Sequence, residues 1–357
     1  MKKFRILTIN PGSTSTKLAI YHHQESELEF NLEHDPIQLK NFDKTIEQFR
    51  FRKEVILTAL QKEGIDLENI DAISARGGLL KPLVGGTYII NQQMLTDLKA
   101  GSYGEHASNL GALIAQEIAK EYDIPAYIVD PVVVDEFEDI ARVSGHPEFE
   151  RKSVFHALNQ KAMARKAADE LRANYQELNL IVAHLGGGIS IGAHKQGRVV
   201  DVNNALDGEG PFTPARSGTL PTGDLMRLSS SGEYSPTELY KMIVGQGGLT
   251  AYCGTSNVKE IEEMIDNGDQ EADLYYRAMA YQVAKWIGAA STVLKGQIDS
   301  IVITGGIAYS KKFTVLIKER VEFLAPVKIY PGENELKALA EGAWRVLSGR
   351  EEAKIYK

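Results

Sequence analysis

The sequence predicts an α/β protein with two domains of like design around a central cleft. The chain has 357 residues, which exceeds the size at which single hydrophobic cores usually stop growing. Short apolar runs typical of buried strands alternate with segments that carry apolar residues at helical spacing. A strand, a polar turn and a second strand follow one another near the start of the chain and again in its middle. This repeated order predicts two domains of similar architecture.

The composition excludes several classes of protein. Hydrophobic residues make up 43% of the chain and charged residues 25%, as in ordinary globular proteins. The net charge of -8 argues against nucleic acid as the main partner, because phosphate backbones attract clustered Lys and Arg. No run approaches the ~20 apolar residues that a membrane span needs. Cys253 is the single cysteine, so no intrachain disulfide can form and we expect a structural thiol in a cytoplasmic protein.

The first half of the chain predicts a hairpin followed by helices and strands. Residues 4–9 (FRILTI) and 17–21 (KLAIY) are apolar runs on either side of a polar turn that contains glycine, which is the pattern of a β-hairpin. Residues 43–63 place most of their apolar side chains on one face of a helix. The other elements expected here are a strand over 70–75, a helix over 106–121 and a strand over 126–129.

The second half predicts the same order of elements without repeating the sequence. The expected elements are helices over 156–173, 273–294 and 336–347 and strands over 180–183, 189–194 and 300–304. A polar stretch with glycine and proline near residues 145–155 predicts the crossover between the domains.

Three polar or glycine-rich turns stand next to predicted strands. Residues 10–17 (NPGSTSTK) combine an amide, four hydroxyls and a lysine, and glycine leaves backbone N–H groups able to face an anion. Residues 184–188 (HLGGG) and 303–307 (ITGGI) follow the ends of buried strands, where open α/β sheets bind ligands. Each turn alone could equally be structural. The GxxxxGK[ST] pattern of a P-loop is absent.

As an ordered set, these turns resemble those of the sugar kinase, actin and Hsp70-type ATPase superfamily. Within it, the chain is most similar to the acetate kinase and butyrate kinase group, and the resemblance spans roughly residues 6–345. Further matching stretches are 76–78 (RGG), 155–156 (FH), 211–218 (PFTPARSG) and 331–336 (PGENEL). The resemblance implies two ribonuclease-H-like domains of the actin-like ATPase fold around a central nucleotide cleft. It assigns 1–152 plus 340–357 to an N-terminal acyl kinase domain and 153–339 to a C-terminal nucleotide-binding domain.

The same resemblance implies an ATP-dependent phosphotransferase with a carboxyl group as acceptor. Residues 105–111 (EHASNLG) and the ending PGENELKALAEGA look like butyrate kinase members of the group. Gly78 stands where acetate kinases carry a valine, and if that position lines the acyl pocket, glycine leaves room for a longer or branched chain. We therefore expect reversible conversion of butyrate and ATP to butanoyl phosphate and ADP by direct in-line transfer.

A carboxylate is already ionised near neutral pH, so catalysis needs no general base and should depend on positioning and charge neutralisation. The resemblance implies that Arg76 binds the substrate carboxylate and that Arg216 binds the transferred phosphoryl group. It implies that His156 and His184 donate hydrogen bonds to the phosphoryl group. Asp130 would orient the site or the water shell of Mg²⁺.

The resemblance also implies metal, acyl and nucleotide contacts. Asn10 and one of Glu333 and Glu335 would hold Mg²⁺, and Glu335 is favoured. Phe155 and Pro214 would line the acyl pocket with Gly78. The residues expected to contact ATP or ADP are Ser13, Ser15, Lys17, His184, Gly186, Gly187, Gly188, Asn257, Lys259, Gly305, Gly306 and Ile307. His106 matches a further family histidine, whereas Asn257 and Lys259 differ from the D-x-R of the family.

Rival functions remain open at the level of sequence. The acid could be acetate, propionate or a branched acid such as isobutyrate or isovalerate. A non-catalytic ATP-binding clamp, like the actin and chaperone members, would lack the paired arginines. A sugar kinase would need a catalytic aspartate for a hydroxyl and a polar sugar pocket. The resemblance further implies a homodimer or a higher homo-oligomer.

Overall fold

The computed structural model describes residues 3–22 and 25–357. The chain divides into two compact units, one formed by Met1–Val134 with Asn334–Lys357 and the other by Asp135–Glu333. The sequence places these junctions later, after residues 152 and 339. Glu136 belongs to the second unit because its carboxylate accepts bonds from Lys161 Nζ at 2.7 Å and from the Val199 N–H at 2.8 Å.

The first unit contains a seven-stranded sheet with the order β12-β5-β6-β4-β1-β2-β3. Its strands are β1 Arg5–Pro11, β2 Ser15–His22, β3 Glu25–Glu33, β4 Ala72–Ala75, β5 Thr87–Ile89, β6 Ala126–Val129 and β12 Lys354–Ile355. β1 is antiparallel to β2, and the neighbours β1, β4 and β6 are parallel. The residues that follow these three parallel strands therefore gather at one edge of the sheet.

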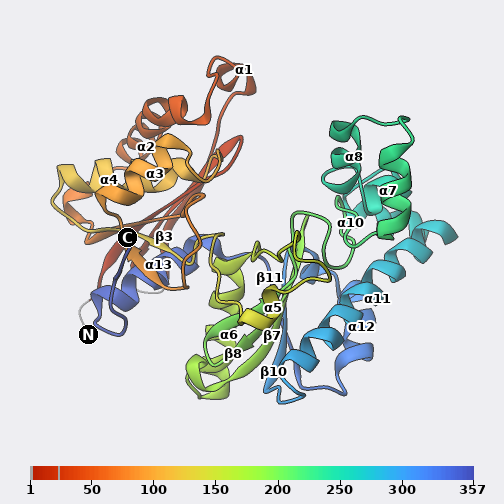
Figure 1. Ribbon diagram of the computed structural model, residues 1–357. Helices are drawn as coiled ribbons and strands as arrows, with labels where there is room; N and C mark the ends of the chain where they lie inside the picture. Colours follow the sequence, from red (N-terminus) through yellow and green to blue (C-terminus); the bar gives the residue numbers. More distant parts are fainter. Residues whose placement is uncertain (1–2, 23–24) are drawn as a thin grey trace. The chain divides into compact units, whose positions relative to one another are not determined.

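Helices cover both faces of this sheet. The helices of this unit are α1 Pro36–Leu39, η1 Thr45–Gln48, α2 Phe49–Lys62, η2 Leu67–Asn69, α3 Gln92–Ala100, α4 Asn109–Glu121 and α13 Glu335–Leu347. The buried side chains of α2, α3 and α4 pack with Leu7, Ile9 and Ile73. The C-terminal helix α13 packs with Ile6 and Ala72 on alternate strand positions, hence on the opposite face. Figure 1 shows α13 in blue beside the red strands, far apart in sequence.

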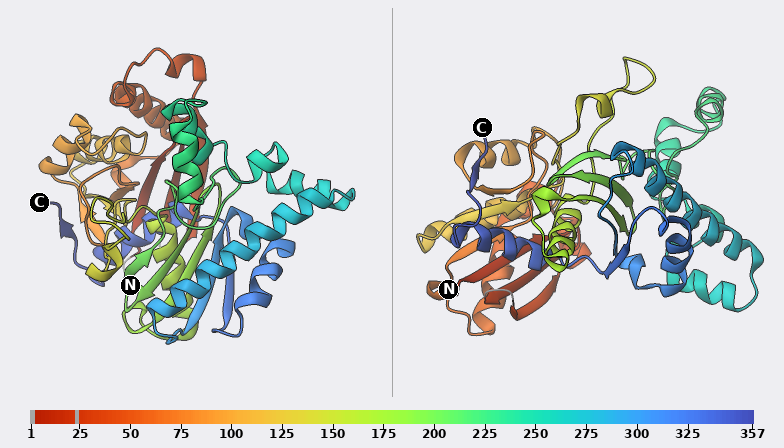
Figure 2. Two further views of the ribbon diagram at one scale, coloured as in Figure 1. Left: turned by 45° about the vertical axis from the view of Figure 1, so that its right-hand side comes forward. Right: turned by 90° about the horizontal axis from the view of Figure 1, so that it is seen from below.

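The second unit contains a five-stranded sheet with the order β11-β10-β7-β8-β9. Its strands are β7 Asn179–Leu185, β8 Ile189–Lys195, β9 Arg198–Val202, β10 Ser300–Gly305 and β11 Val327–Pro331. Its helices are α5 Asp139–Arg142, α6 Ala157–Leu171, η3 Tyr175–Glu177, α7 Thr222–Ser230, α8 Pro236–Ile243, α9 Leu249–Cys253, α10 Val258–Asp266, α11 Gln270–Val293, η4 Gly306–Tyr309 and α12 Lys311–Val321. The helices α11 and α12 lie side by side and share one core with the sheet (Figure 2).

The predicted elements are present with shifted ends. The strand over 126–129 matches β6, whereas the helix expected over 43–63 has an α-helical part beginning at Phe49. β3 was not predicted from the sequence; its alternating charged residues lie largely exposed at the sheet edge. Within the described ranges, no helix is long and apolar enough to cross a membrane.

Cys253 is partly buried and has no disulfide partner, as the sequence predicts. Burial, together with the carboxylates of Asp269 and Glu271, raises the pKa of its thiol. A raised pKa disfavours the thiolate, so Cys253 is a poor nucleophile.

Candidate active site

The predicted hairpin of the first unit is confirmed, with a short turn between β1 and β2. Asn10 lies opposite Lys17 and Pro11 opposite Thr16, and the Gly12 N–H donates to the Ser15 carbonyl at 2.8 Å. The side chains of Ser13 and Lys17 are exposed and that of Ser15 is partly exposed. The hydroxyls and the ammonium group that the sequence assigns to phosphate are therefore accessible at the carboxyl end of β1.

Asn10, Arg76 and Glu335 meet at the same edge of the sheet. Asn10 Nδ2 donates to Glu335 Oε2 at 2.6 Å. Arg76 Nη1 lies 3.4 Å from Glu335 Oε2 and 3.5 Å from Asn10 Oδ1. Arg76 follows β4, while Glu335 is the first residue of α13. Parallel strands and the returning helix thus bring together three residues that are remote in the sequence.

This cluster suits the expected Mg²⁺. No group of three or more His, Cys, Asp and Glu side chains in the described chain could hold a metal ion. Mg²⁺, however, usually keeps several waters and is bound by one or two carboxylates together with substrate phosphates. The amide oxygen of Asn10 and the carboxylate of Glu335 fit that mode. Glu333 lies elsewhere, in the second unit, with Oε1 3.6 Å from His184 Nε2.

The structure corrects the interpretation of Gly78. Glycine has no side chain, yet no room for an acyl chain opens at this position. A Cβ at Gly78 would lie 2.6 Å from Asn109 Cα and 2.8 Å from Leu98 Cδ2. The neighbouring Gly77 is equally crowded, with Pro131 Cβ at 2.6 Å. Glycine at both positions lets the segment after β4 pack against α4 and the end of β6. It therefore serves close packing and does not by itself enlarge an acyl pocket.

Asp130 and His106 lie in the first unit with different surroundings. Asp130 is completely buried, has a positive φ of 37° and accepts the Gly86 N–H at 2.7 Å. The carboxylate of Asp130 thus binds the backbone of the loop before β5, and its role in orienting the site stays a prediction. His106 Nδ1 lies 2.8 Å from Ser108 Oγ. Burial and the nearby charge of Arg76 lower the pKa of His106, which favours its neutral form.

His34 supports the hairpin turn from the end of β3. Its Nε2 lies 2.8 Å from Thr16 Oγ1, and its N–H donates to the Thr14 carbonyl at 2.8 Å. The pKa of His34 is lowered to about 4, mainly by burial and to a smaller extent by the positive charge of Arg52. The structure thus holds a neutral imidazole behind the turn.

We expect this histidine to make folding sensitive to acid. In the unfolded chain His34 binds a proton near pH 6.5, whereas in the folded chain it does so only near pH 4. The contribution of His34 to the free energy of unfolding is therefore fully present above pH 6.5 and is lost as the pH falls toward 4. The loss of stability between pH 7 and 5 should be about 2 kcal/mol. Urea denaturation at both pH values measures it. The variant His34→Gln should lose less stability than the wild type over this interval, and an equal loss would contradict the assignment.

In the second unit, the glycine turns gather at the carboxyl edge of the sheet. β7 and β8 form the second predicted hairpin, closed by a bond from the Gly186 N–H to the Gly188 carbonyl at 3.0 Å. Gly305 ends β10 with a positive φ of 91° and pairs with Gly332 through two backbone bonds. A Cβ at Gly305 would collide with the Leu185 backbone. Glycine is therefore required where β10 approaches the end of β7.

His156 and His184 form a stacked pair with ring centroids 3.8 Å apart and an interplanar angle of 11°. His156 caps the start of α6, and its Nδ1 lies 2.9 Å from Ser190 Oγ. His184 is 2% exposed, and its Nδ1 lies 2.8 Å from Asn159 Oδ1. The buried Nε2 of His184 has no hydrogen-bond partner in the described part of the chain. An unsatisfied buried nitrogen is unusual and is expected where a ligand completes the site.

Arg216 lies against the glycine turn between β7 and β8. A Cβ at Gly188 would collide with Arg216 Nη1, so glycine lets the guanidinium approach the turn. Arg216 Nη1 also donates to the Ala205 carbonyl, and Thr213 Oγ1 donates to the Gly187 carbonyl at 2.7 Å. Burial lowers the pKa of Arg216, yet arginine stays charged in proteins. None of the described carboxylates forms an ion pair with it, which leaves its charge available to an anion.

The expected acyl-pocket residues are both buried. Phe155 is 2% exposed and directly precedes His156. The Pro214 carbonyl accepts the Thr250 N–H at 2.8 Å, which fixes the FTPARSG turn onto α9. Phe155 is thus adjacent in sequence to the stacked histidines, and Pro214 lies two residues before Arg216.

The residues expected to contact adenosine lie around the N-termini of α10 and α12. Asn257 caps α10, with Oδ1 accepting the Lys259 N–H at 3.1 Å and Nδ2 donating to Glu260 at 2.9 Å. Gly306 faces open space. Ile307 belongs to the hydrophobic core, so only its backbone can serve a ligand.

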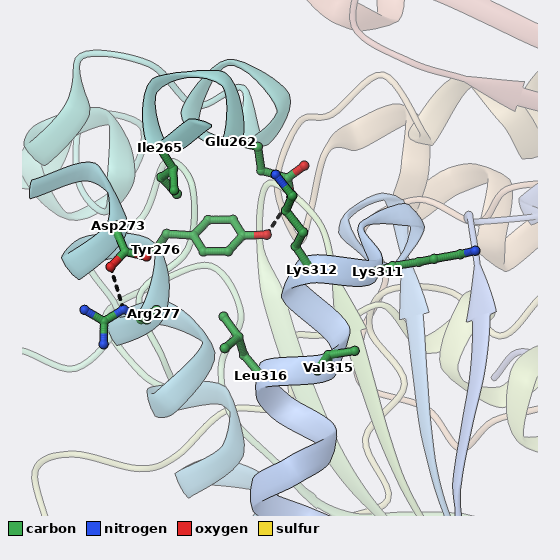
Figure 3. Close-up of a pocket in the computed structure, with 9 residues that line it drawn as sticks. All are labelled: Glu262, Ile265, Asp273, Tyr276, Arg277, Lys311, Lys312, Val315 and Leu316. Atoms are coloured by element: carbon green, nitrogen blue, oxygen red, sulfur yellow. Dashed lines mark hydrogen bonds and ion pairs between the residues drawn. The ribbon is translucent and has the colours of Figure 1, made fainter. Parts of the chain in front are cut away.

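A pocket of about 480 Å³ lies beside these segments, between α10, α11 and α12 (Figure 3). Tyr276, Ile265 and Leu316 form its apolar wall, and Lys311 and Lys312 of α12 also line it. The Tyr276 hydroxyl donates to Glu262 at 2.5 Å and lies 3.1 Å from Ser310 Oγ, the N-cap of α12. This network fixes Ser310 where the nucleotide contacts are expected.

Several residues of these groups were not predicted from the sequence. Asn159 and Ser190 hold the two histidines, and Arg52 lies behind the first turn. A signal for Arg52 exists, because it occupies the helical spacing of the buried Ile56 and Leu60. Asn159 gives a similar signal, since it lies one helical turn after His156 on α6.

Comparisons with known proteins agree with these arrangements. The profile of the acetokinase family matches residues 148–345. Butyrate kinase 2 of Clostridium acetobutylicum is 57% identical over 355 residues, 99% of this chain and 100% of that protein. The crystal structure of Porphyromonas gingivalis acetate kinase superposes with a TM-score of 0.78 at 19% identity, covering 96% of this chain and 100% of that one. A propionate kinase from Francisella tularensis gives a TM-score of 0.74 at 22% identity, with coverages of 95% and 98%. The predicted fold class is confirmed.

Proposed function

This chain belongs to the acetokinase family, and on that premise we propose that it is a butyrate kinase, which converts butyrate and ATP to butanoyl phosphate and ADP. The observation that carries this proposal is the 57% identity to butyrate kinase 2 over the whole length of both chains. The reaction is reversible, with one bond formed between a carboxylate oxygen and the γ-phosphorus as the bond to the ADP oxygen breaks.

The residues of the two units support the mechanism separately. In the first unit, the Arg76 guanidinium is partly exposed and can bind the substrate carboxylate through parallel N–H bonds. In the second unit, Arg216 has no carboxylate partner among the described residues, and His184 has an unsatisfied Nε2. These groups can neutralise charge on the phosphoryl group in transit. Since no base is needed, their work is positioning and electrostatic stabilisation.

The proposal also includes the residues that would bind Mg²⁺ and the nucleotide. Asn10 and Glu335 would hold the ion, which neutralises phosphate charge when bound. Ser13, Ser15 and Lys17 would contact phosphates, and Gly186, Gly187 and Gly188 would approach the nucleotide through their backbone. Asn257, Lys259, Gly305, Gly306 and Ile307 would surround the adenosine. From the family resemblance, we also propose that the protein forms a homodimer or a higher homo-oligomer and lies in the cytoplasm.

The preferred acid is tested by trapping acyl phosphates with hydroxylamine. The purified chain, MgATP and one acid at a time (acetate, propionate, butyrate, isobutyrate, valerate and isovalerate) give kcat/KM values. We expect a maximum at butyrate and poor activity on acetate. A maximum at a branched acid or at acetate would keep the acyl kinase mechanism and overturn the assignment of butyrate. ATP binding without turnover of any acid would favour a non-catalytic clamp.

A further inference from the structure

Arg52 is a fully buried cation that the proposed mechanism does not use. It lies on α2 with 0% exposure. Within the described residues it has no acidic partner, and burial lowers its pKa to about 10. At neutral pH it is therefore still charged. Burying an unpaired charge is costly, so this position needs a physical explanation beyond packing.

The guanidinium is satisfied by oxygens of the first turn and of Gln48, the last residue of η1. Nη1 donates to the carbonyls of Gly12 at 2.8 Å and Ser15 at 3.2 Å. Nη2 donates to the Ser13 carbonyl at 2.9 Å. Gln48 Oε1 accepts the remaining bonds, from Nε at 3.0 Å and Nη2 at 2.8 Å. All five N–H donors of arginine thus have acceptors, and three of these acceptors are backbone carbonyls of the turn.

This contact decides where the N–H groups of the turn point. In a trans peptide the C=O and N–H bonds point in opposite directions. Because the Gly12 and Ser13 carbonyls point at Arg52, the N–H groups of Ser13 and Thr14 point away from it. Neither N–H has a partner within the described chain, and both side chains are exposed. Two outward N–H groups in succession can donate together to one anion, as backbone N–H groups do in phosphate loops.

Arg52 also adds charge to that site. The carbonyl dipoles lie with their negative ends on the guanidinium and their positive ends toward solvent. The buried charge and the aligned peptides therefore create a positive potential on the exposed side of the turn. His34, which faces the same turn from the end of β3, is kept neutral beside Arg52. Charge and geometry both favour a phosphate on the outer side.

We propose that Arg52 is the positioning residue of a phosphate-binding turn formed by residues 12–15, holding its carbonyls inward so that its N–H groups bind a nucleotide phosphate. This inference rests on the proposed function, since it names the ligand of the same turn. Arg52 then supports binding of the nucleotide and not binding of the acid.

The test compares Arg52→Met and Arg52→Lys with Lys53→Met. Lys53, next on the helix, pairs with Glu117 and Glu121 of α4 and does not touch the turn. For Arg52→Met we expect KM for MgATP to rise about 10-fold or more and KM for butyrate to change less than about 2-fold. Arg52→Lys keeps the charge but loses the fork of donors, so it should be intermediate. Lys53→Met should lower the Tm and leave both KM values unchanged.

A structural role alone would lower the Tm of Arg52→Met and leave KM for MgATP unchanged, which would overturn the proposal. Should that variant fail to fold, Gln48→Leu removes only the side acceptor, and about a 3-fold rise of KM for MgATP is expected. Calorimetric binding of ADP to each folded variant provides a readout without turnover. If the wild type phosphorylates no acid, the proposed function fails, while ADP binding weakened by Arg52→Lys would still support the role of Arg52. Unchanged ADP binding would overturn it.

Discussion

Replacing Arg216 by methionine will lower kcat by about 10³-fold, the scale of an arginine that stabilises a phosphoryl group in transit. The guanidinium is partly buried, has no carboxylate partner among the described residues and is held by the Ala205 carbonyl against Gly188. Methionine keeps much of the length and apolar volume of the side chain and removes the charge. The loss should therefore appear in kcat at saturating butyrate and MgATP, measured by hydroxamate formation.

The matched control is Arg227→Met on α7. Arg227 is exposed and pairs with Asp224 in the same helix, so its loss should leave kcat within about 2-fold of the wild type. Arg216→Lys restores a charge without the planar fork and should recover only part of the rate. If Arg216→Met kept more than about a tenth of the wild-type kcat, Arg216 would not be the residue that stabilises the transferred group.

The strands of the sheets and the turns after them could be predicted from the sequence because they depend on local patterns. Apolar runs such as 126–129 and 300–304 match β6 and most of β10, and the glycines after β7 and β10 lie at the strand ends that the sequence predicts. The gathering of Asn10, Arg76 and Glu335 was assigned by resemblance to a known family. Periodicity alone could not supply it, because it depends on α13 returning to the first sheet after the whole second unit.

The wrong inference about Gly78 has a physical reason. A missing side chain leaves empty space only when its neighbours stay in place, and protein interiors close such gaps by packing. Here Asn109 and Leu98 occupy the direction in which a Cβ would point. Asn109 is held there by bonds from its Nδ2 to the Gly104 carbonyl and from the Leu79 N–H to its Oδ1. A glycine in a sequence therefore indicates close approach as readily as it indicates room for a ligand.

The tautomer of His184 follows from Asn159. Asn159 Nδ2 donates to the Glu333 carbonyl at 2.7 Å, which turns its Oδ1 toward His184 Nδ1 at 2.8 Å. Nδ1 must then carry a hydrogen, so Nε2 can donate to a phosphoryl oxygen only when the ring is an imidazolium. Nε2 lies 3.6 Å from a carboxylate oxygen of Glu333.

We therefore expect His184→Phe to lower kcat by about 10²-fold, the effect of removing one hydrogen-bond donor from a developing anion, with KM for butyrate nearly unchanged. Asn159→Leu should lower kcat less, since it frees the ring without removing it. The control is His194→Gln: His194 is a completely buried histidine whose two ring nitrogens face Tyr175 and Gln160, so its loss should reduce Tm and spare kcat. Steady-state hydroxamate kinetics on folded variants measure all three. Equal losses of kcat in His184→Phe and His194→Gln would mean that both histidines are structural, whereas a loss confined to His184→Phe follows from a donor whose Nε2 is left open for the substrate.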